Sequence, residues 1–89
     1  MKNRLPTKKV DNEGNIEYVL DGYTHREDGP AVEYVDGYRA WYILGKLHRE
    51  DGPAREFGGG YMEWWLHGEK YPFSSQEEFE RFLKLRVLW

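Results

Sequence analysis

A heptapeptide, His-Arg-Glu-Asp-Gly-Pro-Ala, occurs twice in this chain, at residues 25–31 and again at residues 48–54. The interval from position 25 to position 48, called the repeat interval below, also separates glycines and large apolar residues outside the two copies. These sets are Gly14, Gly37 and Gly60; Gly22, Gly45 and Gly68; Tyr18, Trp41 and Trp64; Val19, Tyr42 and Trp65; and Leu20, Ile43 and Leu66. Such a fixed interval is typical of repeat architecture, in which the terminal units are often degenerate. The sequence therefore predicts three tandem units of about 23 residues each.

Each unit is predicted to be an antiparallel β-hairpin. Asp36-Gly37 lies between two runs rich in β-branched and aromatic residues, and Asp-Gly is a strong signal for a two-residue type I′ turn. Residues 58–60 (Gly-Gly-Gly) and 11–14 occupy the same place in the other units. The heptapeptide, with Asp-Gly for a tight turn and a proline that lacks an amide donor, is predicted to connect one hairpin to the next.

Alternation along the strands assigns two faces to the predicted sheet. The face expected to form the core carries Tyr18, Leu20, Trp41, Ile43, Trp64 and Leu66. Val19, Tyr42 and Trp65 point the other way and provide more aromatic area than a solvated surface needs. We expect the C-terminal segment or a partner to cover this second face.

The last part of the chain predicts a helix. Ser75 to Glu78 reads as a capping box, in which serine and glutamate satisfy free amides at a helix start. Apolar residues follow at helical spacing. The predicted fold is α+β and β-dominant: three tandem antiparallel β-hairpin repeats closed by one C-terminal amphipathic helix. We expect a single domain over 1–89, divided into a basic segment (1–13), the hairpins (14–73) and the helix (74–89).

Composition excludes several classes of function. The chain has no cysteine, which excludes disulfides, thiolate nucleophiles and zinc–thiolate sites. A net charge of -3 with mixed signs does not suggest general affinity for nucleic acid. No apolar run approaches the roughly 20 residues of a membrane span, and residues 1–10 do not resemble a signal peptide. We therefore expect a cytoplasmic protein that binds neither membranes nor nucleic acid.

The stretch from His25 to Ala54 resembles the HREDGPA-type tandem repeats of proteins from bacteriophages, bacteria and large DNA viruses. Those repeats are similar to variant MORN repeats, which are also hairpins of about this length. The resemblance extends from residue 14 to about residue 83, where residues 67–83 loosely match the family's helical ending. It implies an interaction module, and for a small stand-alone chain a phage accessory protein acting against a host defence system. It carries over no catalytic residue.

The two heptapeptides supply the first set of candidate site residues, which share imidazole, guanidinium and carboxylate groups. They are His25, Arg26, Glu27, Asp28, His48, Arg49, Glu50 and Asp51. Imidazole and carboxylates could bind a divalent metal or act as an acid–base pair if neighbouring connectors stack. Two identical copies without a distinct nucleophile favour a structural connector instead, so we expect no metal, no cofactor and no catalysis.

Aromatic residues supply the second set, Tyr38, Tyr42, Tyr61, Trp65 and Trp89. Most rings are expected in the core, because a chain of 89 residues has a thin one. The remainder could bind a protein, since tyrosine and tryptophan dominate interface hot spots, or stack on a nucleotide base. Nearby acids (Glu17, Glu33, Glu56 and Glu63) would repel a phosphate backbone.

The sequence thus favours a non-catalytic binding protein whose target is another protein, such as a host defence component that it inhibits. A protein that sequesters a small nucleotide signal is the alternative, and a hydrolase using the His-Arg-Glu-Asp residues is less favoured. A homo-oligomer is also compatible, because hairpin repeats leave sheet edges open.

Overall fold

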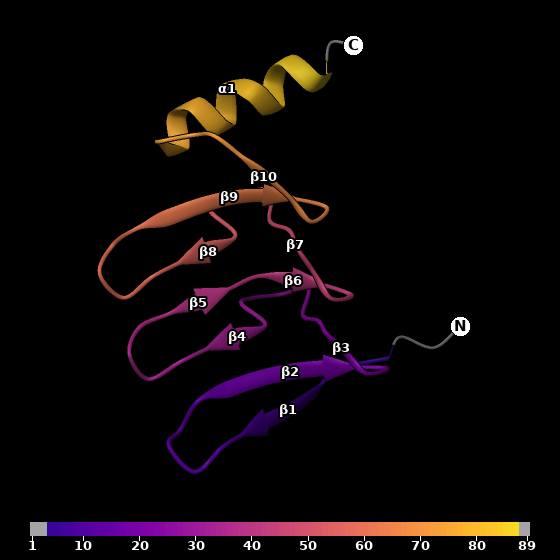
Figure 1. The fold of residues 1–89 in the computed structure, drawn as a ribbon. Coiled ribbons are helices and arrows are strands. Elements are labelled where there is room, and N and C mark those ends of the chain that lie inside the picture. Colours follow the sequence, from indigo (N-terminus) through magenta and orange to yellow (C-terminus); the bar gives the residue numbers. More distant parts are fainter. Residues whose placement is uncertain (1–3, 88–89) are drawn as a thin grey trace.

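A computed structural model describes residues 4–87, which form a small β-rich domain with an antiparallel sheet and one C-terminal helix (Figure 1). The elements are β1 (Thr7–Val10), β2 (Ile16–Leu20), β3 (Tyr23–Thr24), β4 (Val32–Glu33), β5 (Arg39–Ala40), β6 (Tyr42–Ile43), β7 (Lys46–Leu47), β8 (Arg55–Glu56), β9 (Met62–Leu66), β10 (Glu69–Tyr71) and α1 (Gln76–Val87). The basic segment predicted for residues 1–13 therefore includes a strand, β1. No helix in the described part of the chain has both the length and the apolar character to cross a bilayer.

The strands form one antiparallel sheet in the order β1-β2-β4-β5-β8-β9-β10, with β3 also paired to β2. Strands β6 and β7 pair separately. The hairpins β1-β2, β4-β5 and β8-β9 follow one another in space, and α1 lies beyond β9 (Figure 1). The result is a slab with principal extents of 42 × 40 × 17 Å. Because the slab is thin, few side chains can lie far from solvent, and partly exposed side chains must contribute to the core.

The turns differ from the prediction. Positive φ at two consecutive residues, the mark of a type I′ turn, occurs at Asp21-Gly22 (52° and 84°), Leu44-Gly45 (47° and 84°) and His67-Gly68 (51° and 83°). Asp36 is not among the described non-glycine residues with positive φ, so the predicted type I′ turn at Asp36-Gly37 is wrong.

The Asp36-Gly37 loop is a longer turn instead. Tyr34 N donates to Tyr38 O (2.9 Å) and Gly37 N donates to Tyr34 O (3.0 Å), and Gly37 alone adopts a left-handed φ of 97°. This is a three-residue hairpin loop closed by a glycine, which tolerates that conformation without steric cost.

The prediction that the face of Trp41 forms the core holds only near the helix. Trp64 and Leu66 are buried there (4% and 2% exposed) together with Phe79 of α1. Elsewhere on that face Tyr18, Leu20, Trp41 and Ile43 are only half-buried. A second buried cluster was not predicted. It consists of Val32, Ala40, Leu47 and Ala54. Tyr38, Tyr42 and Trp65 pack against it. The two alanines of this cluster are fully buried (0% exposed), so it was not recognisable from large apolar residues alone.

The helix begins as its capping signal predicts. Glu78 N donates to Ser75 Oγ (3.2 Å), while the Glu78 carboxylate accepts from Ser74 N (2.9 Å) and not from Ser75 N. The helix spans 76–87 where the sequence predicted 74–89, and residues 88–89 lie outside the described part.

Candidate functional site

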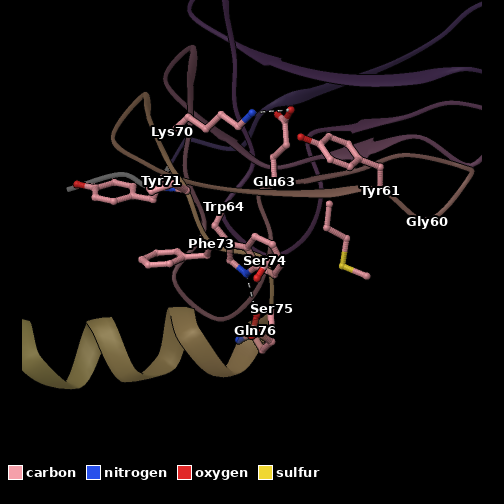
Figure 2. Close-up of a pocket in the computed structure, with 12 residues that line it drawn as sticks. Gly60, Tyr61, Glu63, Trp64, Lys70, Tyr71, Phe73, Ser74, Ser75 and Gln76 are labelled. Carbon is pink, nitrogen blue, oxygen red and sulfur yellow. Dashed lines mark hydrogen bonds and ion pairs between the residues drawn. The ribbon is translucent and has the colours of Figure 1, made fainter.

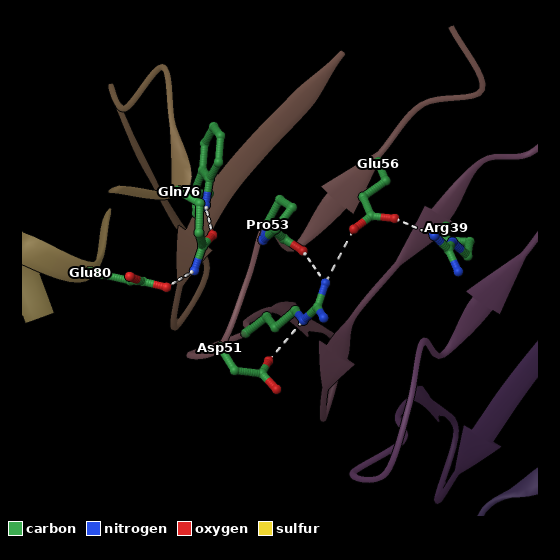
Figure 3. A network of polar contacts seen from close by, with 8 residues as sticks. Arg39, Asp51, Pro53, Glu56, Gln76 and Glu80 are labelled. Carbon is green, nitrogen blue, oxygen red and sulfur yellow. Dashed lines mark hydrogen bonds and ion pairs between the residues drawn. The ribbon is translucent and has the colours of Figure 1, made fainter. Parts of the chain in front are cut away.

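Each heptapeptide folds around its arginine. The guanidinium carbon of Arg49 lies 3.8 Å from the centre of the Trp41 ring, which is a cation–π distance. Its Nε donates to Asp51 (2.8 Å), and its terminal nitrogen donates to Pro53 O (3.1 Å) and contacts Glu56 (3.3 Å; Figure 3). The side chain is thus held on one face by a ring and at its end by three oxygen acceptors.

The first copy repeats this arrangement. Arg26 lies 4.2 Å from the centre of the Tyr18 ring and donates to Asp28 (2.9 Å) and Pro30 O (3.1 Å). The glycine of the heptapeptide makes room for the arginine: a Cβ at Gly52 would lie 2.7 Å from the guanidinium carbon of Arg49. The spacing Arg-x-x-Gly therefore follows from the packing of the arginine.

The two histidines bridge to backbone 19 residues further along. His25 Nδ1 accepts from Leu44 N (2.9 Å), and His48 Nδ1 accepts from His67 N (3.0 Å). Since Nδ1 is the acceptor, the neutral ring carries its proton on Nε2, which faces Glu27 (3.5 Å) and Glu50 (3.3 Å) respectively. Burial, followed by the charge of His67, lowers the pKa of His48, which favours this neutral form.

His67 is a site residue that the sequence reasoning missed. Its ring centre lies 4.3 Å from that of His48, and candidate ligand atoms of His48, Glu50 and His67 lie within 4.8 Å of one another. From the sequence we expected His25 and His48 to be the pair of candidate ligands. His25 does not belong to this group. The repeat could have indicated this contact. His67 precedes Gly68 just as Leu44 precedes Gly45, and the amide of each bonds to the histidine 19 residues before it.

The hydrogen bonding of His48 opposes metal binding by this group. A neutral imidazole that binds a metal through Nε2 must carry its proton on Nδ1. At His48 that nitrogen already accepts the His67 N–H, so the metal-bound form would bring two N–H donors together. The contacts of the heptapeptides thus suit connection between strands better than ligation.

The aromatic candidates lie together on the sheet. Alternation places six rings on the same face as Ala40, and we call this surface the tyrosine-rich face. It consists of Tyr34, Tyr38, Tyr42, Phe57, Tyr61 and Trp65. Four of them form a row across two hairpins, with ring centres 5.4 Å apart for Tyr34 and Tyr38, 5.1 Å for Tyr38 and Phe57, and 5.5 Å for Phe57 and Tyr61.

Charged groups run between these rings. Arg55 donates to the Tyr38 hydroxyl (3.0 Å) and pairs with Glu63 (3.3 Å), which also contacts Lys70 (3.3 Å) and accepts from Trp65 Nε1 (2.9 Å). Burial acts to raise the pKa of Glu63, but the Trp65 hydrogen bond and the two cations outweigh it and lower the pKa overall. Burial, then Tyr38, raises the pKa of Tyr42. The Tyr42 hydroxyl therefore stays protonated and can donate a hydrogen bond at neutral pH.

The C-terminal helix does not cover this face. Phe79 packs with Trp64 and Leu66, whose side chains point to the opposite face from Trp65. Tyr34 and Tyr61 are about half exposed (48% and 56%), and the other four rings are partly buried. The expected cover by the C-terminal segment is therefore wrong for residues 76–87, and the candidate Trp89 lies outside the described residues.

A depression of ≈570 Å³ lies along β9, and Tyr61 and Glu63 of the tyrosine-rich face are among the residues that line it (Figure 2). Its walls are the strand residues from Gly60 to Trp64 and the segment from Lys70 to Gln76. Trp64 Nε1 donates to Gln76 Oε1 (2.9 Å) across its floor. The depression sits between the last hairpin and the start of α1.

No protein-family model, curated protein or solved structure matches this chain. The fold and the contacts of its side chains are therefore the basis for assigning a function.

Proposed function

We propose that this protein is a non-catalytic binding protein that recognises another protein through its tyrosine-rich face. The observation that carries the proposal is that six aromatic rings share one face of the sheet while α1 packs on the other. Tyrosine and tryptophan bury large areas at low conformational cost and retain a polar group for orientation, which is why they dominate interface hot spots.

The charges on this face favour a protein over a nucleic acid. Glu63 and Glu17 lie among the rings, and Arg55 and Lys70 are already paired with Glu63. A phosphate backbone needs free cations. A protein surface can instead satisfy tyrosine hydroxyls and the rim of ion pairs, as in a polar, aromatic interface.

We assign the heptapeptides a structural role within the three tandem units predicted from the sequence. Support comes from contacts that recur at the repeat interval: the arginine on an aromatic ring, the histidine on a backbone amide, and the left-handed pairs that begin at Asp21, Leu44 and His67. The histidine and arginine side chains of both copies are engaged in these internal bonds. The more specific role of a phage-type inhibitor of a host defence component rests on the sequence resemblance alone.

The experiment that tests the proposal compares two equally exposed tyrosines. Tyr61 lies on the tyrosine-rich face and Tyr23 pairs with Leu20 on the opposite face (56% and 55% exposed). A protein captured from host lysate by the tagged chain would be purified and titrated calorimetrically against Tyr61→Glu and Tyr23→Glu. Tyr61→Glu should weaken binding at least about tenfold, roughly 1.4 kcal/mol, while Tyr23→Glu binds normally. Equal affinity of both variants would place the interface elsewhere.

A further inference from the structure

The last hairpin leaves part of its outer edge without a strand. Strand β9 pairs with β8 through Met62 and Glu63, and with β10 only through Trp64, Trp65 and Leu66. Among residues 4–87, no strand pairs with Met62 and Glu63 on the β10 side. This open half of β9 faces the ≈570 Å³ depression described above.

The same edge is occupied in the two earlier hairpins. Ile16 and Glu17 of β2 pair with Glu33 and Val32 of β4. In the second hairpin, Arg39 and Ala40 of β5 pair in the same way with β8. Positions 16, 39 and 62 are separated by the repeat interval, so the chain fills this edge twice and leaves it open once.

The hairpin tips show the same difference. A Cβ at Gly14 would lie 3.3 Å from Val35, and a Cβ at Gly37 would lie 3.1 Å from Gly58, because the next hairpin packs against each tip. A Cβ at Gly60, the third tip, would have no atom within 4 Å among the described residues. The third tip is therefore uncovered among the described residues, as is the half of β9 that β10 does not pair.

We propose that the open edge at Met62 and Glu63 binds an extended peptide segment of a partner protein by adding it as a further antiparallel strand. Backbone hydrogen bonds would supply the general attraction, and the adjoining depression would select one side chain. The edge adjoins the tyrosine-rich face, because Tyr61 and Glu63 also line the depression. The Met62 variant tests the edge by itself, since Met62 points to the opposite face of the sheet from Tyr61.

The neighbouring side chains indicate the chemistry of that segment. A residue opposite Met62 would point to the same face as Met62, toward a depression walled by Trp64, Tyr71 and Phe73. Met62 is itself 46% exposed. An apolar residue fits this position, where it would cover apolar surface that now meets water.

A second copy of this chain fits the edge poorly. Its β1 is the free strand aligned with β4 and β8, since Lys8, Ala31 and Ala54 follow one another at the repeat interval. Both alanines are fully buried between neighbouring strands. A lysine in that place would bury its charge without a partner, which is costly, and lysines on an edge strand commonly prevent edge-to-edge pairing.

The test uses a peptide of known pairing behaviour as the probe. An acetylated peptide with the sequence of residues 30–38 contains β4, which already pairs with the equivalent edge of β2. In its Glu33→Val form an apolar residue would face Met62. We expect the valine peptide to bind about tenfold tighter than the parent and to shift the amide resonances of residues 62–64 in a nitrogen-15 NMR titration, because Tyr18 N, at the position equivalent to Trp64, donates to Ala31 O in the β2–β4 pair.

Two controls make the result specific. Met62→Lys should weaken binding of the valine peptide at least about tenfold. Leu44→Lys, in the exposed turn between β6 and β7, should leave binding unchanged. Tyr34 N donates to Tyr38 O within its own hairpin (2.9 Å), so alternation turns the N–H of residue 33 the other way, toward β2. N-methylation at residue 33 of the peptide should therefore abolish binding.

The outcomes are decisive in either direction. Shifts centred on residues 62–64 and lost with Met62→Lys and with the N-methyl peptide would support the proposal. No shifts, shifts centred elsewhere, or equal binding by Met62→Lys would overturn it. Concentration-dependent self-association that Met62→Lys removes would assign the edge to a second copy and would also overturn it.

Discussion

Tyr18 and Trp41 on one hand, and Trp64 on the other, occupy equivalent places on the same face of the sheet but are covered in different ways. Arg26 and Arg49 lie over the first two rings, at 4.2 and 3.8 Å, and both rings remain half-buried. Phe79 of α1 packs on Trp64, which is buried. Gln76 of α1 adds a hydrogen bond to its ring nitrogen.

The difference teaches how a thin sheet is closed. An arginine covers a ring and also bonds to the connector that carries it, so each heptapeptide both shields one hairpin and leads to the next. The helix shields the ring without leading to a further strand. It ends the series of hairpins by burying apolar side chains, which stabilises the fold more than an arginine over a ring does. Substitutions in the helix and at the arginine test this contrast.

The largest effect is expected at Phe79, which is fully buried. Phe79→Ala should lower the free energy of unfolding by about 3–5 kcal/mol, because it removes the cover of Trp64 and leaves a cavity. Urea unfolding followed by circular dichroism measures this. Leu85→Ala, at an exposed position of the same helix, should cost about 0.5 kcal/mol or less. A similar loss for both would mean that α1 contributes by propensity and not by packing.

The arginine cover should matter less than the helix but more than an ordinary ion pair. Arg49→Met should cost about 2–3 kcal/mol, from the cation–π contact with Trp41 and the charged hydrogen bonds to Asp51 and Pro53. Arg4→Met is the control, because that exposed arginine pairs with the exposed Asp21 (2.6 Å) and its loss should cost about 0–1 kcal/mol. Chemical denaturation of both variants compares them, and equal costs would contradict a packing role for Arg49.

The space under the arginine gives a smaller effect. Gly52→Ala should cost about 1–3 kcal/mol, since the new Cβ would displace the Arg49 guanidinium. Gly59→Ala, where a Cβ would meet no atom of residues 4–87 within 4 Å, should be neutral or stabilise slightly. Thermal melting distinguishes the two, and an undisturbed Gly52→Ala protein would show that the heptapeptide tolerates movement of its arginine.

The smallest effect concerns the contact between the His48 and His67 rings, which lie 4.3 Å apart. The pKa of His48 is lower in the folded protein than in the unfolded chain, so the unfolded chain binds a proton more readily. The stability that this difference provides at a pH above the ordinary pKa of histidine is therefore lost as the pH falls. His67→Leu, which gives this position the residue found at Leu44, removes one cause of that shift. The variant should lose less melting temperature than the original chain between about pH 7.5 and about pH 5.5. An identical pH dependence would contradict the coupling between His48 and His67.

Local signals in the sequence predicted the hairpins, the helix and its serine cap, because each depends on a few adjacent residues. The turn assignment failed because Asp-Gly occurs at both Asp21 and Asp36 but only the first forms a two-residue turn. Leu44-Gly45 and His67-Gly68 form the same turn without any turn-forming residue before the glycine. Hydrogen bonds from the amides of both turns to the preceding connector hold this backbone, and local propensity does not report such contacts.

The candidate sites divide in the same way. Alternation correctly placed Tyr42 and Trp65 on one face, since a period of two needs no knowledge of the fold. The contact between His48 and His67 was missed because it depends on how one turn lies against the preceding connector. The open edge of β9 likewise follows only from the path of residues 71–75, which turn away to begin α1 (Figure 1).

The order of the strands also determines how the molecule would respond to mechanical load. Strand β1 lies at one end of the sheet and α1 beyond the other, so the ladders between hairpins lie in series between them (Figure 1). Tension applied to these two elements would act along the interstrand hydrogen bonds and open the ladders one after another. Such a chain would lengthen in small steps under low force, with each intact hairpin still folded while its neighbour unzips.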